Sequence, residues 1–187
     1  MQKVVSAGLV FAFGLSICAL TAMSADISDL LERANKGEPE AQFDLAEMYR
    51  NGDGVQKNAE EAEQWYRKAG ENGSADAQYT LGKMYRNGEG VPKNNVEAAK
   101  WYRKAAEQGV PDAQADLGLI YANGQGVPRD YGESVQWYRK AAEQGNANAQ
   151  HGLGIMYHNG FGVDRDDTEG MKWFRKAAEQ GYSGKPQ

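Results

Sequence analysis

Tryptophan and glycine recur along this chain with a constant spacing of 36 residues. The tryptophans of the protein are Trp65, Trp101, Trp137 and Trp173. Glycine follows the same period at Gly37, Gly73, Gly109, Gly145 and Gly181. A fixed period of this length is typical of a solenoid, in which each structural unit packs only against its neighbours. The repeat therefore predicts stacked units rather than one globular core.

Each unit carries two apolar stripes at helical spacing. The units are residues 37–72, 73–108, 109–144 and 145–180. In the first unit the two stripes are Ala41, Leu45, Met48 and Tyr49, and then Ala62, Trp65, Tyr66 and Ala69. Such stripes are typical of amphipathic helices that bury one face. Because two short helices cannot bury their apolar faces alone, neighbouring units have to stack.

The residues between the stripes predict where each helix begins and ends. Pro39 and Pro111 stand at first helical positions, where no backbone donor is needed. An Asn-Gly pair such as Asn51-Gly52 closes each first helix, with the glycine in the left-handed conformation. A capping box opens each second helix. Its N-cap residues are Asn58, Asn94, Asp130 and Asp166, and its glutamates are Glu61, Glu97, Glu133 and Glu169.

The recurring motif carries a family resemblance. It reads Ala-Gln-x-x-Leu-Gly-x-x-Tyr, then Asn-Gly-x-Gly-Val-Pro, then Trp-Tyr-Arg-Lys-Ala-Ala-Glu-Gln-Gly. Over residues 37–181 this motif resembles the Sel-one-like repeat (SLR), a relative of the tetratricopeptide repeat. The resemblance implies an all-α fold, namely a right-handed α-solenoid of four 36-residue helix–loop–helix repeats, and a role as an adaptor for protein partners.

The best-known secreted bacterial proteins of this kind carry a cysteine pair in each repeat, and some are described as penicillin-binding or β-lactamase-like. This chain departs from them, because its one cysteine, Cys18, precedes the first unit.

Residues 1–24 have the pattern of a secretory signal peptide. Lys3 is followed by a mostly apolar stretch that ends at Leu20 and then by small residues. Cleavage after Ser24 places Ala22 and Ser24 at the two positions that require small side chains. We therefore predict a periplasmic or secreted protein. The alternative is an uncleaved membrane anchor, which the short and interrupted apolar run disfavours.

The chain that follows the signal peptide is acidic and free of cysteine. Loss of residues 1–24 removes Lys3 and no acidic residue, so the formal charge changes from −5 to −6. An acidic, exported protein without thiols is a poor candidate for binding nucleic acid or an anionic membrane. We expect a protein partner, no nucleic acid, and no membrane contact beyond the signal peptide.

No pattern in the sequence predicts a catalytic, cofactor or metal site. The loop motif Gly-x-Gly-Val-x-[Lys/Arg] lacks the third glycine of a dinucleotide site and follows a helix rather than a strand. His151 and His158 share a helix face, but two turns, about 10 Å, separate them, which is too far for one metal ion. Neither Ser-x-x-Lys nor His-Glu-x-x-His occurs. We predict that the protein is not an enzyme and uses no cofactor.

The first helices of a stacked helical solenoid line its concave surface, so the positions that vary between units are the candidate partner contacts. The predicted contacts are Phe43, Glu47, Arg50, Tyr79, Lys83, Arg86, Leu119, His151, Ile155 and His158, with Phe161 on the following loop. Aromatic and arginine side chains are favoured at interface hot spots. The alternative is that Leu119 and Ile155 are half-buried against the next unit and that the other residues are ordinary surface.

The two ends of the solenoid differ. Residues 25–36 have the length of one more helix and predict an N-terminal capping helix. Residues 181–187 form a short C-terminal tail, and we see no capping segment after the last unit. Either the last helix pair tolerates exposure, or a partner or a second copy covers it. Self-association through this end is therefore an open alternative.

Three functions follow from these patterns. The first, which we predict, is an exported adaptor that binds an envelope protein through its concave face. A narrower form is an immunity protein against a periplasmic toxin. The second is an enzyme of cell-wall or β-lactam chemistry, motivated by the cysteine-rich relatives alone. The third is a structural part of a secreted or surface assembly.

Overall fold

The computed structural model describes residues 27–182 of the chain. The predicted signal peptide and residues 183–187 of the predicted tail lie outside the described residues. A helix over residues 27–35 comes first. The helices that follow it are α2 (Pro39–Asn51), α3 (Ala59–Glu71), α4 (Ala75–Asn87), α5 (Asn95–Glu107), α6 (Pro111–Asn123), α7 (Tyr131–Glu143), α8 (Ala147–Asn159) and α9 (Asp167–Glu179).

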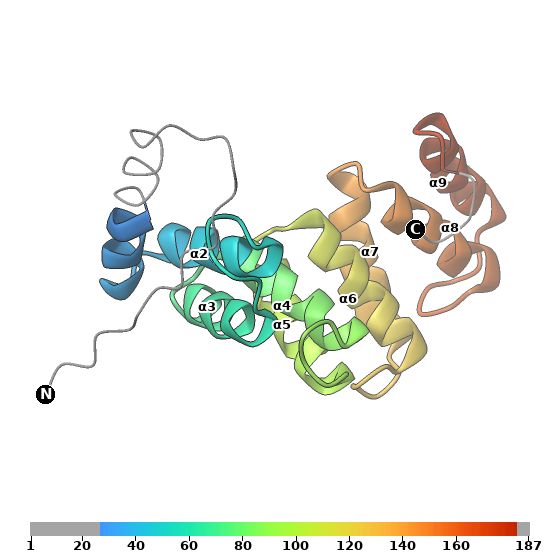
Figure 1. The fold of residues 1–187 in the computed structure, drawn as a ribbon. Helices are drawn as coiled ribbons and strands as arrows, with labels where there is room; N and C mark the ends of the chain where they lie inside the picture. Colours follow the sequence, from blue (N-terminus) through green and yellow to red (C-terminus); the bar gives the residue numbers. More distant parts are fainter. Residues whose placement is uncertain (1–26, 183–187) are drawn as a thin grey trace, which may run out of the picture.

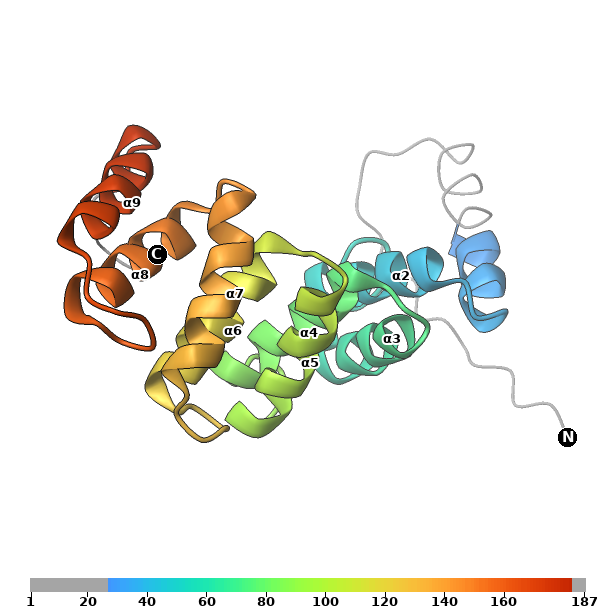
Figure 2. The ribbon, with the colours of Figure 1, turned by 180° about the vertical axis from the view of Figure 1, so that it is seen from behind.

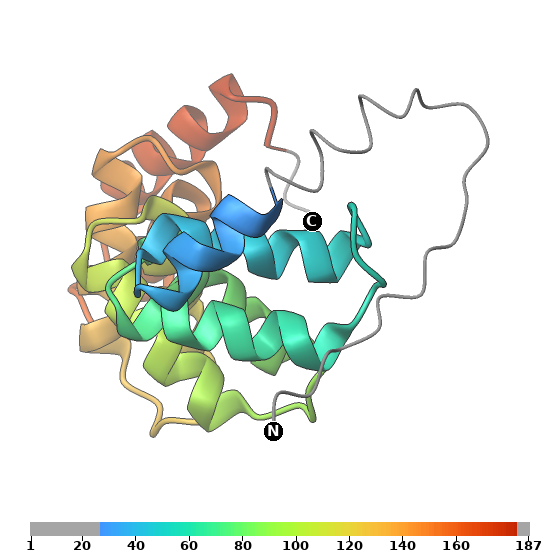
Figure 3. The same ribbon diagram turned by 60° about the vertical axis from the view of Figure 1, so that its left-hand side comes forward.

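The helices pack in chain order into a curved stack (Figure 1). Each first helix (α2, α4, α6 or α8) pairs with the second helix of its own repeat (α3, α5, α7 or α9). The helices α4, α6 and α8 also pack against the second helix of the preceding repeat, as the view from behind shows (Figure 2). The turned view shows the pairs following one another into the distance (Figure 3). The predicted all-α solenoid of four 36-residue repeats with an N-terminal helix is confirmed.

The predicted cap residues form the helix ends. The Asn94 side chain accepts hydrogen bonds from the backbone N–H groups of Val96 and Glu97, each at 3.1 Å. Gly88 ends α4 in the left-handed conformation, with φ of 79°. One part of the predicted capping box is wrong. The backbone N–H of Asn94 donates to the carbonyl of Tyr85 at 2.8 Å, so this donor does not bond the Glu97 carboxylate.

A buried glutamine near the start of each first helix joins neighbouring repeats. These glutamines are Gln42, Gln78, Gln114 and Gln150. The Nε2 of Gln114 donates to the carbonyl of Ala106, near the end of α5, at 3.1 Å. Its Oε1 accepts a bond from Gln144, which follows α7, at 2.8 Å. The last carbonyls of a helix lack the usual partner four residues on, and at each junction the glutamine adds a hydrogen bond to one of them.

Glycines in the first helices make room for aromatic rings of the second helices. A Cβ atom on Gly118 of α6 would lie 2.7 Å from Cδ1 of Tyr138 in α7. Gly82 and Tyr102 have the same relation in the preceding repeat, with a separation of 2.6 Å. Tyr102 is completely buried there. The glycines therefore let the two helices of a repeat approach until the ring fills the space between them.

The outer face of α9 carries exposed apolar surface. Met171 of α9 is 60% exposed, whereas the equivalent Val135 of α7 is 5% exposed because it packs in the core. At the opposite end Ala34 is buried, and Leu30 packs against the core of the first repeats. In the described part of the chain no helix is long and apolar enough to cross a bilayer.

Candidate functional site

A hollow of about 310 Å³ opens on the face formed by the first helices, which we call the concave face. From α4 it is lined by Tyr79 and Arg86, and from α6 by Asp112, Ala115, Asp116 and Leu119. From α8 it is lined by Asn148, His151, Gly152 and Ile155. Tyr138 of α7 and Tyr182, which follows α9, complete the lining. Side chains of three consecutive repeats therefore meet at one site.

The hollow lies where the third repeat lacks a ring that the other repeats possess. The rings at this position are Phe43, Tyr79 and His151, and each packs against an aromatic ring of its own second helix. The centroids of Tyr79 and Tyr102, for example, are 5.7 Å apart. Ala115 is the equivalent residue of the third repeat, and its side chain ends at Cβ. The hollow therefore reaches Tyr138 at the place where the third repeat has no ring.

An ion pair joins two repeats across the charged end of the hollow. Nη1 of Arg86 lies 2.6 Å from Oδ1 of Asp116. Burial raises the pKa of Asp116, and the neighbouring Arg86 opposes this rise. Arg86 is the one lysine or arginine among the described residues that line the hollow, and this pair neutralises it. Asp112, at the rim, is exposed and accepts a bond from Asn146 at 2.7 Å.

The other end of the hollow is apolar and aromatic. The ring centroid of His151 lies 4.9 Å from that of Tyr182 and 5.3 Å from that of Phe174. Burial lowers the pKa of His151 below its ordinary 6.5, so the imidazole is neutral at pH 7. Leu119 is 38% exposed and Ile155 is 37% exposed. An uncharged surface therefore faces solvent beside the Arg86 pair.

Comparison with protein families identifies the repeat. The family model described as the Sel1 repeat matches residues 39–74, 75–110, 111–146 and 147–182. The chain belongs to the Sel1 repeat family. Each matched Sel1 repeat begins at the first residue of a first helix, two residues after the glycine that marks the predicted unit. None of the curated proteins compared with this sequence matches it.

Solved structures of bacterial Sel1 repeat proteins resemble this chain. A protective antigen of uropathogenic Escherichia coli strains, which displays an SLR fold, is 45% identical with a TM-score of 0.77. The match covers 82% of this chain and 33% of the antigen, so this chain spans about a third of the antigen's length. A Sel1 repeat protein from Oxalobacter formigenes is 41% identical over 88% of this chain and 69% of that chain, with a TM-score of 0.78.

The cysteine-rich protein B of Helicobacter pylori is a more distant structural relative. It is 26% identical over 68% of this chain and 92% of its own, with a TM-score of 0.52. The four Sel1 repeats of this chain contain no cysteine. The helix-pair architecture is therefore held here by the packing and the hydrogen bonds described above.

The predicted partner contacts divide into two groups. The hollow is lined by Tyr79, Arg86, Leu119, His151 and Ile155. The residues that lie outside it are Phe43, Glu47, Arg50, Lys83, His158 and Phe161. Two residues of the second group form hydrogen bonds within the first Sel1 repeat. Glu47 accepts one from the Tyr66 hydroxyl and one, at 2.7 Å, from Arg50. Leu119 and Ile155 lie on the concave face, and each is little more than one-third exposed.

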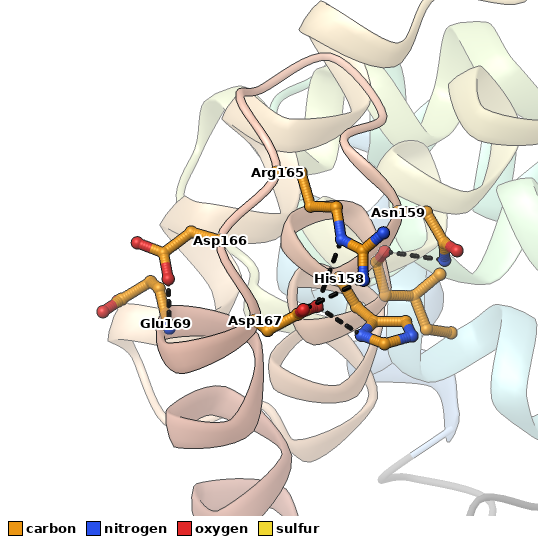
Figure 4. A network of polar contacts seen from close by, with 7 residues as sticks. His158, Asn159, Arg165, Asp166, Asp167 and Glu169 are labelled. Atoms are coloured by element: carbon orange, nitrogen blue, oxygen red, sulfur yellow. Dashed lines mark hydrogen bonds and ion pairs between the residues drawn. The ribbon is translucent and has the colours of Figure 1, made fainter.

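His158 and Phe161 are engaged by the start of neighbouring second helices. Figure 4 shows the Asp167 carboxylate between the His158 imidazole, at 2.8 Å, and the Arg165 guanidinium, at 2.9 Å. The bond from Arg165 lowers the pKa of Asp167, and His158 adds to this effect. Phe161 stacks on Tyr131, with ring centroids 4.8 Å apart and planes 9° from parallel. These contacts hold the last loop of the solenoid.

Several residues that line the hollow were not predicted from the sequence. They are Asp112, Asp116, Tyr138, Asn148, Gly152 and Tyr182. The signal for one of them was a departure from the repeat, since Gly152 stands where the other repeats have Asp44, Thr80 and Asp116. Gly152 lies close to Tyr138, because a Cβ atom there would be 2.8 Å from the ring. In residues 27–182, no three His, Cys, Asp or Glu side chains are placed to hold a metal ion.

Proposed function

We propose that this protein is an exported adaptor that binds an envelope protein through the concave face of its Sel1 repeats. One observation carries the proposal. Residues that vary between the repeats converge from α4, α6 and α8 on one hollow. The signal-peptide pattern of residues 1–24 supports export.

The composition of the hollow supports a protein as the ligand. Tyrosine and arginine, which are enriched at interface hot spots, stand at its charged end as Tyr79 and Arg86. At the other end Leu119 and Ile155 expose apolar surface that a partner would remove from water. Protein–protein interfaces likewise combine apolar contacts with polar ones.

A crosslinking pull-down from periplasmic extract tests the proposal. The bait is the full chain with a C-terminal tag, run beside the double variant Leu119→Glu/Ile155→Glu. A matched control is Val96→Glu, since Val96 is 48% exposed on α5, outside the hollow. We expect one stoichiometric partner that the wild type and the control capture and the double variant loses. A partner retained by all three proteins would refute the concave face as the binding site.

The identity of the captured protein decides the narrower form of the proposal. A secreted toxin would make this chain an immunity protein, and a resident envelope protein would make it a general adaptor. The proposal includes the absence of enzymatic activity. We therefore expect no covalent labelling of the chain by a fluorescent penicillin, and a labelled band would argue for the enzyme of β-lactam chemistry.

A second candidate function, a structural part of a surface assembly, is favoured by the exposed apolar face of α9. Met171 is the most exposed of the large hydrophobic residues that stand out on the described surface, at 60%. Light scattering over a concentration series tests self-association through this face. Dimers or larger species that disappear in Met171→Glu would favour the assembly, and a monomer at every concentration would exclude it.

A further inference from the structure

The third Sel1 repeat interrupts a row of aromatic contacts. In the other three repeats a ring of the first helix packs against a ring of the second helix. Ala115 stands in its place in the third repeat, and Tyr138 lines the hollow beside it. Tyr138 is 6% exposed, whereas Tyr102 and Tyr66 are fully buried. An edge of the Tyr138 ring is therefore open to a ligand at the position of the missing ring.

The walls of this gap favour an apolar group. In the first repeat the hydroxyl of Tyr66 donates to Glu47. Leu119 occupies the position of Glu47 in the third repeat and accepts no hydrogen bond. Ile155 occupies it in the fourth repeat, and both side chains border the hollow more than one-third exposed. A ring entering the gap would cover both of them and would meet the Tyr138 edge in the tilted geometry of the neighbouring pairs.

The charge at the rim of the gap favours a cation. Arg86 is neutralised by Asp116, as described above. Asp112 lies one turn before Ala115 on the same face of α6, so its carboxylate stands next to the gap. One hydrogen bond, from Asn146, engages this exposed carboxylate. A carboxylate accepts several hydrogen bonds, so Asp112 has capacity for a lysine or arginine of a partner.

We propose that the gap binds an aromatic side chain of the partner protein, and that a lysine or arginine beside this residue in the partner's sequence pairs with Asp112. The aromatic side chain takes the place that Phe43 and Tyr79 occupy in their own repeats. This inference rests on the proposed function and names the chemistry that the concave face recognises: an aromatic residue next to a basic one.

A peptide array tests this preference directly. Two adjacent central residues in a Gly-Ser frame are varied over all amino acids, and the fluorescently labelled full chain is the probe. Ala115→Tyr fills the gap with the ring that the second repeat carries, and Ala115→Ser is a matched control that keeps it open. Thermal unfolding checks that each variant folds. If Ala115→Tyr does not fold, Ala115→His replaces it, since His151 is the equivalent residue of the fourth repeat.

We expect the wild type and Ala115→Ser to select Phe, Tyr or Trp beside Lys or Arg. The dissociation constant of the best peptide, measured by fluorescence polarisation, rises at least about tenfold in Ala115→Tyr, since the buried area and the ring contact are both lost. Asp112→Asn keeps the aromatic preference and loses the basic one. Selection of another pair, no selection, or equal binding by Ala115→Tyr would overturn the inference.

The peptide array and the pull-down test different claims, so a negative result in one does not imply a negative result in the other. If the array result is negative while the double variant Leu119→Glu/Ile155→Glu loses its captured partner, the aromatic anchor is refuted and the proposed function stands. If all three baits of the pull-down retain the partner, the proposed function is refuted.

Discussion

Replacement of Gly118 by alanine is expected to destabilise the solenoid, although glycine is a poor helix former. The ring of Tyr138 lies between two glycines on different helices. A Cβ atom on Gly118 of α6 would lie 2.7 Å from Cδ1 of this ring, and one on Gly152 of α8 would lie 2.8 Å from its Cζ. Carbon atoms pack at about 3.5 Å or more. The ring cannot move away from α6 without approaching α8.

Two opposing terms give the expected magnitude. Alanine is better than glycine in a helix interior by about 1 kcal/mol. Overpacking a core costs about 1–3 kcal/mol, and the upper end applies here because the ring is held from both sides. The free energy of unfolding should therefore fall by about 2 kcal/mol. For a protein of this size the midpoint of thermal unfolding falls by about 2–4 °C for each kcal/mol, so we expect a decrease of about 4–8 °C.

Thermal and urea unfolding followed by circular dichroism measure this effect. Gly132→Ala in α7 is the matched control, because a Cβ atom there meets only the Asp130 side chain, at 3.3 Å. We expect the control to stay within about 0.5 kcal/mol of wild type. If Gly118→Ala is as stable as the control, or more stable than wild type, the claim that the two glycines fix the Tyr138 ring is wrong.

Three further predictions concern hydrogen bonds and protonation. Gln114→Leu should lower the free energy of unfolding by about 1–3 kcal/mol, because it removes the two hydrogen bonds of a buried side chain, to the Ala106 carbonyl and from Gln144; urea unfolding measures this, and no loss would contradict the role of the glutamines. Asn94→Ala should cost about 1 kcal/mol in the same assay through loss of the α5 N-cap, and a cost equal to that of Asn95→Ala would refute this role. Because burial lowers the pKa of His151 below 6.5, the unfolded chain takes up the proton first as the pH falls, and stability present above pH 6.5 is lost on acidification. Urea midpoints at about pH 7.5 and about pH 5.5 should therefore differ less in His151→Phe than in wild type.

The sequence alone predicted the repeat, the helices and their ends, because these depend on residues close together in the chain. A cap such as Asn94 bonds backbone groups two and three residues away, and a glycine such as Gly88 ends the helix that precedes it. The other half of the predicted capping box, a hydrogen bond from the backbone N–H of Asn94 to the Glu97 carboxylate, does not form, because a residue farther away in the chain accepts this bond. Tyr85, nine residues before Asn94, offers its carbonyl to the same backbone donor.

The concave face was predictable in part from helical phase. Tyr79, Leu119 and Ile155 were expected there because they share one helix face within their repeats, and all three line the hollow. Helical phase gives no information about contacts between repeats. Arg86 pairs with Asp116, a residue of the next repeat, and the sequence analysis named only the arginine.

The sequence therefore determined that this protein is a stack of four helix pairs and which faces of the helices vary. The tertiary structure decided which variable residues form one site. The hollow requires that α4, α6 and α8 lie side by side and that no ring of the third repeat fills the space at Ala115. Tyr182, far along the chain from Tyr79, lines the same hollow. This convergence depends on the curvature of the stack of helices. The sequence of a single helix does not determine that curvature.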